Sequence, residues 1–261
     1  MVKKHISRRW ICAWILAILT VAAAPTRADD YKPIIKDGWE ILFDGKSTDA
    51  WDVDLSAGAW AIDKDGSLYV AHAGPNIYTK QRYCDYVLEL DYRIVSGKKS
   101  NSGVFIRVHN KADEVNTGME IQILDDDDYN VKHDALNAVG ALYDMVPPAV
   151  PAANPVGEWN HYKITVNDNV VQVELNGKQI VDADLNKWTT PHQNPDGHHN
   201  KYPHAIGDLP REGFLGLQNY NGTPVWFKNV RIKPIGDRQA KYTGKEPIKD
   251  VLAKPEEAPS K

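Results

Sequence analysis

The stretch LELDYRI, residues 88–94, alternates apolar with charged side chains, and VFIRV, residues 104–108, places apolar residues at the same two-residue spacing. A period of two is that of a β-strand with one buried face, because successive side chains point to opposite faces. No stretch after residue 35 keeps a long apolar period of 3.6 residues, as an amphipathic helix would. The sequence therefore predicts an all-β protein.

Two dipeptides mark tight turns between predicted strands. Asp65-Gly66 separates residues 60–62 from 68–70, and Asn176-Gly177 separates residues 171–175 from 179–181. Such dipeptides suit two-residue hairpin loops, whose central residues need positive φ. We therefore expect strands to pair mainly with their sequence neighbours. Further predicted strands are residues 39–43, 119–124, 161–167, 214–218 and 225–232.

The number and spacing of these strands indicate the fold class. About a dozen short strands without alternating helices are typical of a sandwich of two antiparallel sheets. Two long irregular segments, 125–157 and 186–211, are rich in Pro together with Asp, or with His and Asn. Loops of this length in a compact domain commonly carry function, so both are predicted to border a binding site.

Composition and charge narrow the function classes. The 261 residues are 42% hydrophobic, enough for one large domain with a buried core. Residues 1–28 hold five basic and no acidic side chains, so their removal would change the net charge from −4 to −9. A chain without a basic excess is unsuited to neutralising phosphates, which argues against a nucleic-acid partner. The absence of a Gly-Xaa-Ser-Xaa-Gly motif and of a phosphate-binding glycine loop argues against a serine hydrolase and a nucleotide enzyme.

Residues 1–28 have the pattern of a cleaved secretory signal peptide. A basic start is followed by an apolar run, residues 10–24, and by Thr26-Arg27-Ala28, which has small residues at the two positions that a signal peptidase recognises. An uncleaved anchor is the alternative, but the run is shorter than the roughly 20 residues that span a bilayer. We expect an exported protein, periplasmic or secreted, with no stable membrane span after cleavage. The predicted organisation is a signal peptide at 1–28, a linker at 29–36, a domain at 37–235 and a charged, loosely ordered tail at 236–261.

The segment EIQILD, residues 120–125, contains the strongest candidate site. In a strand, Glu120 and Gln122 share one face while Ile121 and Ile123 point to the core. Asp125 falls on the core face by strict alternation, but a β-bulge near residues 123–124 would return it to the face of Glu120. The alternative is a solvent-facing polar stripe on an outer sheet.

The neighbouring predicted strand supplies a cation. Residues 104–108 bury alternate apolar side chains, which places Phe105, Arg107 and His109 on the opposite face. Antiparallel pairing could lay Arg107 beside Glu120 or Gln122, where a guanidinium could hold a carboxylate or a substrate oxygen. The alternative is a plain cross-strand ion pair, worth under about 1 kcal/mol if exposed.

Residues 125–128 are four consecutive aspartates, which could supply oxygen ligands to Ca²⁺. Such a run lacks the alternating spacing of an EF-hand loop, so a solvated turn is the alternative. Whether the protein binds a metal is left open, and a divalent cation such as Ca²⁺ is the candidate cofactor.

Aromatic residues near predicted loops suggest a sugar ligand. Trp51, Tyr143, Trp188 and Tyr220 lie in or beside such loops, where exposed rings can stack on the apolar faces of sugar rings. With the acidic residues and the amide of Gln122, they indicate a carbohydrate cleft that takes an oligosaccharide. The remaining tryptophans after the signal are predicted to pack in the core or at its edge: Trp39, Trp60, Trp159 and Trp226.

Eight segments run in order through about residues 37–234, and they are 38–46, 101–107, 120–125, 140–143, 157–160, 175–177, 210–218 and 227–230. As a set, they resemble the 3-keto-disaccharide hydrolase family, which is related in fold to concanavalin-like lectins and to the glucanases of glycoside hydrolase family 16. Two departures stand out: members often carry His-Gly where this chain has Asn219 to Gly222, and Lys228 replaces a usual arginine.

The resemblance implies a concanavalin-like jelly-roll sandwich of two antiparallel sheets, with the site on the concave sheet. It also implies an exported enzyme that cleaves 3-keto-glycosides or 3-keto-disaccharides, by proton abstraction at C2, elimination and hydration. A non-catalytic, lectin-like binding module is the main alternative, and a structural domain with a solubilising acidic stripe is a third.

Residue roles follow from the same resemblance. Family 16 glucanases place an acid, an Asp and an acid at i, i+2 and i+5, where this chain has Glu120, Gln122 and Asp125. An amide in the middle does not suit their double-displacement mechanism. We therefore expect Glu120 to be the acid or base, Arg107 and Gln122 to hold the enolate-like oxygen, and Asp125 to be a second acid/base or a metal ligand. The other predicted substrate contacts are Tyr143, Gln218, Trp51 and Asn101.

Overall fold

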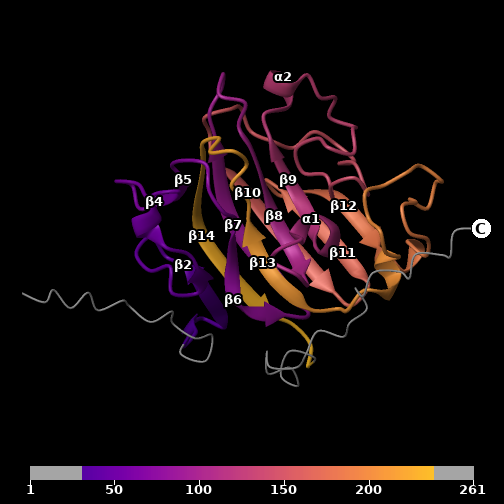
Figure 1. The fold of residues 1–261 in the computed structure, drawn as a ribbon, viewed down its shortest axis with the longest axis horizontal. Coiled ribbons are helices and arrows are strands. Elements are labelled where there is room, and N and C mark those ends of the chain that lie inside the picture. The colour runs from indigo at the N-terminus through magenta and orange to yellow at the C-terminus, as the bar shows by residue number, and fades with distance from the viewer. Residues whose placement is uncertain (1–30, 238–261) are drawn as a thin grey trace, which may run out of the picture. The chain divides into compact units, whose positions relative to one another are not determined.

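Two antiparallel sheets make up the protein in the computed structural model, which describes residues 31–237 (Figure 1). The nine-stranded sheet has the order β1 (Ile34–Lys36), β2 (Trp39–Phe43), β14 (Val225–Pro234), β7 (Tyr86–Ile94), β10 (Asn160–Asn167), β11 (Val170–Leu175) and β12 (Lys178–Asp184), with β5 (Leu68–Val70) on β14 and β4 (Trp60–Ile62) on β5. The five-stranded sheet has the order β3 (Trp51–Asp52), β6 (Ile77–Tyr83), β13 (Gly213–Leu217), β8 (Asn101–Val108) and β9 (Met119–Leu124). This confirms the predicted jelly-roll sandwich.

Helices are few and short. The α-helices are α1 (Glu114–Thr117) and α2 (Asp126–Tyr129), and 3-10 turns span Leu55–Ala57, Leu185–Lys187 and Ile206–Asp208. Within residues 31–237, no helix has the length and apolar character to cross a membrane. The predicted signal peptide and most of the predicted tail lie outside the described residues.

Two predicted hairpins are confirmed. β4 pairs with β5 around Gly66 (φ 81°), and β11 pairs with β12 around Asn176 and Gly177, which have φ values of 52° and 78°. Positive φ at both Asn176 and Gly177 matches the right-handed twist of the flanking strands. At the other turn only Gly66, and not Asp65, has positive φ, and the loop from Ile62 to Leu68 is longer than two residues.

The prediction that strands pair mainly with sequence neighbours is wrong. β14 inserts between β2 and β7, and β13 inserts between β6 and β8, so that strands far apart in sequence become adjacent. Apolar alternation specifies which face of a strand is buried, but not which strand lies beside it.

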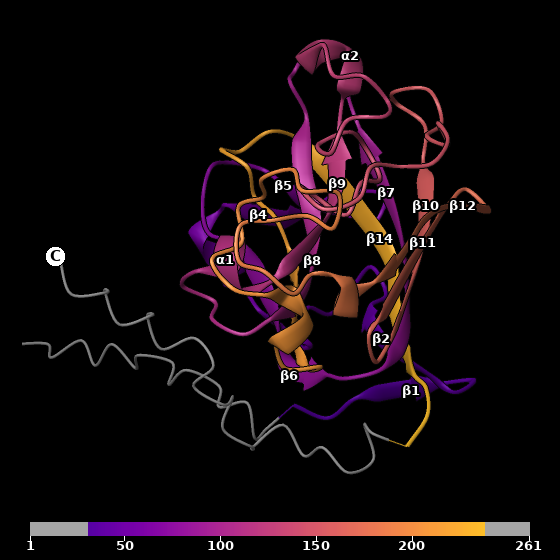
Figure 2. The same cartoon turned by 90° about the vertical axis from the view of Figure 1, so that its right-hand side faces the viewer.

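The core fills the space between the two sheets, which Figure 2 shows as two layers. Leu88 and Leu90 of β7 face it from the larger sheet, and Val104, Ile121 and Ile123 face it from the smaller one. Burying one such side chain contributes about 1.5–3 kcal/mol, so the alternation seen in the sequence is the main force that holds the layers together.

Trp51 belongs to this core and not to a binding surface. The short strand β3 pairs with β6, leaving Trp51 only 2% exposed, with its indole Nε1 donating a hydrogen bond to the Leu42 carbonyl at 2.8 Å. Trp188 is also buried, and its Nε1 donates to Asn194 Oδ1. The sequence predicts both rings at a sugar site because their segments have no strand pattern. Long-range packing buries them instead.

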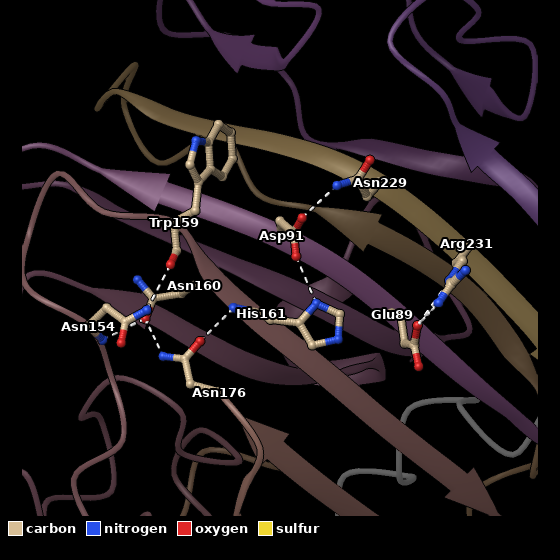
Figure 3. Close-up of polar contacts among 9 residues, drawn as sticks. All are labelled: Glu89, Asp91, Asn154, Trp159, Asn160, His161, Asn176, Asn229 and Arg231. Carbon is tan, nitrogen blue, oxygen red and sulfur yellow. Dashed lines mark hydrogen bonds and ion pairs between the residues drawn. The ribbon is translucent and has the colours of Figure 1, made fainter.

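The outer face of the nine-stranded sheet carries paired charges (Figure 3). Asp91 accepts hydrogen bonds from His161 Nδ1 at 2.7 Å and from Asn229 Nδ2 at 2.6 Å, while Arg231 Nε donates to Glu89 at 2.9 Å. A groove of about 590 Å³ runs beside these residues and Trp39. Exposed ion pairs of this kind contribute little to stability.

We expect Trp51→Ala to lower the free energy of unfolding by about 3–5 kcal/mol, because it removes a large buried ring and leaves a cavity. Urea unfolding followed by circular dichroism measures this. Trp226→Ala is the control, because Trp226 is only partly buried on the outer face and should cost less. Equal losses in the two variants would contradict a core position for Trp51.

Candidate active site

Glu120 and Gln122 lie on the face of the five-stranded sheet that points away from the core, here called the Glu120 face. Ile121 and Ile123 point into the core, as their alternation predicts. The Glu120 face is not open, however, because Glu120 is 6% and Gln122 3% exposed. The polar pair is therefore buried and is not the solvent-facing stripe of the alternative interpretation.

A segment of the first long loop covers the free edge of β9. The backbone N–H of Gln122 donates to the Ala141 carbonyl at 3.0 Å, and the Tyr143 N–H donates to the Glu120 carbonyl at 2.8 Å. Gly140 N–H donates to the Gln122 carbonyl in the same way. These bonds pair the backbone N–H and carbonyl groups on the outer edge of β9, which would otherwise lack partners, and they place Tyr143 beside Glu120.

Glu120 has room for its carboxyl group because its neighbour on β8 is a glycine. Phe105 pairs with Glu120, Gly103 lies diagonally beside it, and a Cβ at position 103 would stand 2.2 Å from Glu120 Oε1. Burial raises the pKa of Glu120 to about 7, offset in part by the Lys201 ammonium and by a hydrogen bond from Gln218. A carboxyl group that titrates near neutral pH can act as both general acid and general base.

Two amides complete the polar surface around Glu120. Gln218 follows β13, and its backbone N–H donates to the Gly103 carbonyl at 3.0 Å. Gln122 Nε2 donates to the Asn137 carbonyl at 3.3 Å. Among the described residues, no donor reaches the buried Oε1 of either glutamine. Because an unsatisfied buried acceptor is costly, these two oxygens are the natural acceptors for a ligand's hydroxyl groups.

Lys201, from the second long loop, was missed by sequence reasoning. Its Nζ lies 4.7 Å from the ring centroid of Tyr143 and 5.2 Å from that of Tyr202, and its charge is coupled to that of Glu120. A single lysine in a loop rich in Pro, His and Asn carries no periodic signal, so only the fold reveals this contact.

Arg107 does not reach Glu120, contrary to the prediction. Phe105 pairs with Gly216 and Val108 with Phe214, so β8 has one residue more than β13 between matched positions. Arg107 lies in this bulge with φ of 51°. The bulge interrupts the alternation, so Val108 packs on the side of Phe105.

The guanidinium of Arg107 instead makes contacts away from the Glu120 face. It is 2% exposed, its Nη2 lies 3.6 Å from Asp85 Oδ1, and it donates to the Cys84 carbonyl at 3.4 Å. Its observed contacts are therefore those of a structural ion pair.

Asp125 is also separated from Glu120. The register of β9 with β8 is continuous from Met119 to Leu124, so no bulge returns Asp125 to the Glu120 face. Its carboxylate caps α2 by accepting from the Asp128 N–H at 3.2 Å, beside a pocket of about 350 Å³. Burial raises its pKa.

The aspartate run does not converge on one point. Asp126 accepts from the Val139 N–H at 2.9 Å and Asp128 from the Lys99 N–H at 3.1 Å, so neighbouring carboxylates bind different backbone groups. Across residues 31–237, no three His, Cys, Asp or Glu side chains are grouped to hold a metal ion. Calcium binding stays a prediction from the sequence.

The remaining predicted contacts have mixed positions. Asn101 begins β8 on the same face as Gly103 and Phe105, two residues before Gly103, and its carbonyl accepts from Thr223 Oγ1. Tyr143 is half-buried, and burial together with the nearby Glu120 carboxylate raises its pKa, whereas Tyr220 is 41% exposed. The Glu120 face thus combines Glu120 with Gln122, Gln218, Tyr143, Asn101 and Lys201.

Residues 38–233 match the family described as the 3-keto-alpha-glucoside-1,2-lyase-like domain. The chain belongs to this family. The resemblance found in the sequence is confirmed by this match, which spans both sheets and every residue of the Glu120 face.

Similar proteins agree with this family assignment. A 3-keto-disaccharide hydrolase of Bacteroides thetaiotaomicron is 27% identical over 237 residues, covering 78% of this chain and 80% of the relative. A crystal structure described as a putative glycosyl hydrolase of Parabacteroides distasonis is 32% identical, with a TM-score of 0.67, covering 76% of this chain and 99% of that one. A second crystal structure of a putative glycosyl hydrolase from the same organism is 25% identical, with a TM-score of 0.61, and covers 78% of this chain and 99% of that one.

We predict that Glu120 makes stability depend on pH. The native pKa of about 7 exceeds the ordinary 4.5, so between these values the native state keeps a proton that the unfolded state has lost. The free energy of unfolding of the wild type should therefore fall with rising pH, relative to Glu120→Gln, by about 3 kcal/mol across this window and no further above it. Urea unfolding of both proteins from pH 4 to 8 measures this, and a constant difference would contradict it.

Arg107→Met should lower the free energy of unfolding without changing the pKa of Glu120. We expect a loss of about 3–5 kcal/mol, because the variant leaves the buried Asp85 without its cation. The pKa of Glu120, followed by NMR of its carboxyl carbon, should stay unchanged. A large shift of that pKa would show that Arg107 acts on Glu120 after all.

Proposed function

We propose that this protein is an exported enzyme that cleaves 3-keto-glycosides, with Glu120 as its general acid and base. One observation carries the proposal: a buried carboxyl group with a pKa near 7 lies among amide oxygens that have no donor within the described chain. Family membership and the hydrolase and lyase descriptions of its relatives support this reaction class. Export rests on the pattern of residues 1–28.

The first step uses the acidity that a ketone gives its neighbour. The carboxylate of Glu120 takes the proton from C2, and the electron pair of the C–H bond moves to make an enolate at C3. The enolate then re-forms the C3 carbonyl, a double bond forms between C1 and C2, and the C1–oxygen bond breaks. The departing oxygen takes a proton, which the protonated Glu120 can donate.

Water completes the cleavage. It adds at C1 of the conjugated double bond and a proton returns to C2, so that the net reaction is hydrolysis. If the product leaves before hydration, the same site acts as a lyase. Glu120 serves both proton transfers, which fits a pKa near the working pH.

The double displacement of retaining glycosidases fits this site less well. That mechanism needs two carboxyl groups about 5–5.5 Å apart across the glycosidic bond. Here Gln122 occupies the middle position of the family 16 pattern, and Asp125 caps α2. An elimination route needs one acid/base at C2 and a group that stabilises the enolate oxygen.

A turnover assay tests the proposal. Protein lacking residues 1–28 is incubated with 3-keto-trehalose or a 3-keto-glucoside, with unoxidised sugars beside them, and products are measured by mass spectrometry. We expect the wild type to release 3-keto-glucose. Glu120→Gln should lose turnover by about 10²–10⁴-fold while still binding the sugar.

Glu89→Gln is the matched control, because Glu89 pairs with Arg231 on the outer face of the other sheet and should keep full activity. A chelator arm tests the calcium prediction. Binding of plain glycans without turnover of any keto sugar would contradict the proposed enzymatic activity and favour a lectin-like binding module. Sequencing the N-terminus of protein recovered from the expressing cells tests cleavage of the predicted signal peptide.

A further inference from the structure

Lys201 is a partly buried lysine without a salt-bridge partner among the described residues. Its side chain passes over two tyrosine rings, and none of the ion pairs formed within residues 31–237 includes it. Removing an ammonium even partly from water is unfavourable, and a charged partner normally offsets this cost. The ammonium of Lys201 contacts aromatic rings instead of such a partner.

The backbone around Lys201 is tightly anchored. Its N–H donates to Oδ2 of Asp144 at 2.6 Å, and Asp144 is the residue that follows Tyr143. The Tyr202 carbonyl accepts from the His192 N–H at 2.7 Å, and the Tyr202 hydroxyl donates to the Tyr143 carbonyl at 3.4 Å. These bonds tie the two long loops to each other and hold the backbone of Lys201 beside the first long loop.

Three carboxylates act on this ammonium from different elements. Glu120 comes from β9, Asp144 from the first long loop and Glu114 from α1. Burial lowers the pKa of Lys201, and these three carboxylates partly restore it. The ammonium lowers the pKa of Glu120 in return. Glu120 and Lys201 therefore influence each other's pKa without forming an ion pair. The Lys201 ammonium lies 4.7 Å from the ring centroid of Tyr143, whose backbone N–H donates to the Glu120 carbonyl.

We propose that Lys201 binds the C3 carbonyl oxygen of the keto sugar and stabilises the enolate, a role that the family resemblance led us to expect for Arg107 together with Gln122. This inference rests on the proposed function, in which Glu120 takes the proton from C2. C2 and C3 are adjacent atoms, so the base and the cation must act on neighbouring positions. The electron pair of the C2–H bond ends on the C3 oxygen, and the ammonium keeps its own proton while donating a hydrogen bond.

The size of the effect follows from charge stabilisation beside Glu120, which is only 6% exposed. Removing one group that stabilises a developing oxyanion typically lowers the rate by about 10²–10³-fold. The tyrosine rings help to keep the ammonium in place, since their faces attract cations. A structural lysine would instead affect folding without a selective effect on proton abstraction.

The test measures proton abstraction separately from cleavage. A 3-keto sugar that carries hydrogen in place of the C1 leaving group is incubated with enzyme in D₂O, and exchange at C2 is followed by NMR. We expect Lys201→Met to slow exchange by about 10²–10³-fold and Lys201→Arg to restore part of it. Lys99→Met is the matched control, because Lys99 also lies over a tyrosine ring, 5.8 Å from the centroid of Tyr129, and should leave exchange unchanged.

A second readout reports on charge. Loss of the ammonium in Lys201→Met should raise the pKa of Glu120, seen in the NMR signal of its carboxyl carbon and in the pH profile of exchange. If Lys201→Met does not fold, Lys201→Gln keeps a hydrogen-bond donor without the charge and should show the same slowing. If the folded Lys201 variants exchange the C2 hydrogen at the wild-type rate, this inference alone is overturned. If the wild type shows no exchange at C2, the proposed function is overturned as well.

Discussion

The six residues of β9 pair with β8 in continuous register, and this pairing determines both the core and the site. It directs Ile121 and Ile123 into the space between the sheets and Glu120 and Gln122 to the opposite face. A slip of one residue would exchange the two sets, which would place a carboxylate between the sheets and remove two isoleucines from the core. Apolar burial between the sheets therefore holds the site in its register, so the stability of the core and the geometry of the Glu120 face are not independent.

The pKa of Glu120 is shifted in the opposite direction from that of Asp91, an acidic residue of the other sheet. Asp91 on the outer face is partly desolvated, but hydrogen bonds from His161 and Asn229 more than compensate and lower its pKa. Glu120 has one amide donor and a coupled ammonium, which do not offset its burial. Burying such a carboxyl group lowers the stability of the native state, and the packing of the core offsets this loss. The two long loops create this environment, because one covers the edge of β9 and the other brings Lys201.

Some of the segments that carry the family resemblance are explained by structure alone. Asn160 accepts hydrogen bonds from the Asn154 N–H and from Asn176 Nδ2, and Asn176 Oδ1 accepts from the His161 N–H (Figure 3). These bonds tie the end of the first long loop to the hairpin turn at residues 176–177. The Trp-Asn and Asn-Gly motifs thus preserve a joint of the larger sheet, on the opposite side of the sandwich from Glu120. A family motif is therefore not by itself a sign of a catalytic residue.

The sequence by itself determined what depends on neighbours along the chain: the strand type, the two hairpin turns, the bounds of β2 and β9, and the opposite faces of Glu120 and Ile121. Period and turn chemistry are local, so no fold was needed to find them. Only the tertiary structure decided the insertion of β13 and β14, the core position of Trp51, and the approach of Lys201 to Glu120. The bulge at Arg107 belongs with these, because an extra residue in β8 has meaning only against β13, more than 100 residues later. Strand neighbours and loop contacts depend on long-range packing, which no local pattern in the sequence records.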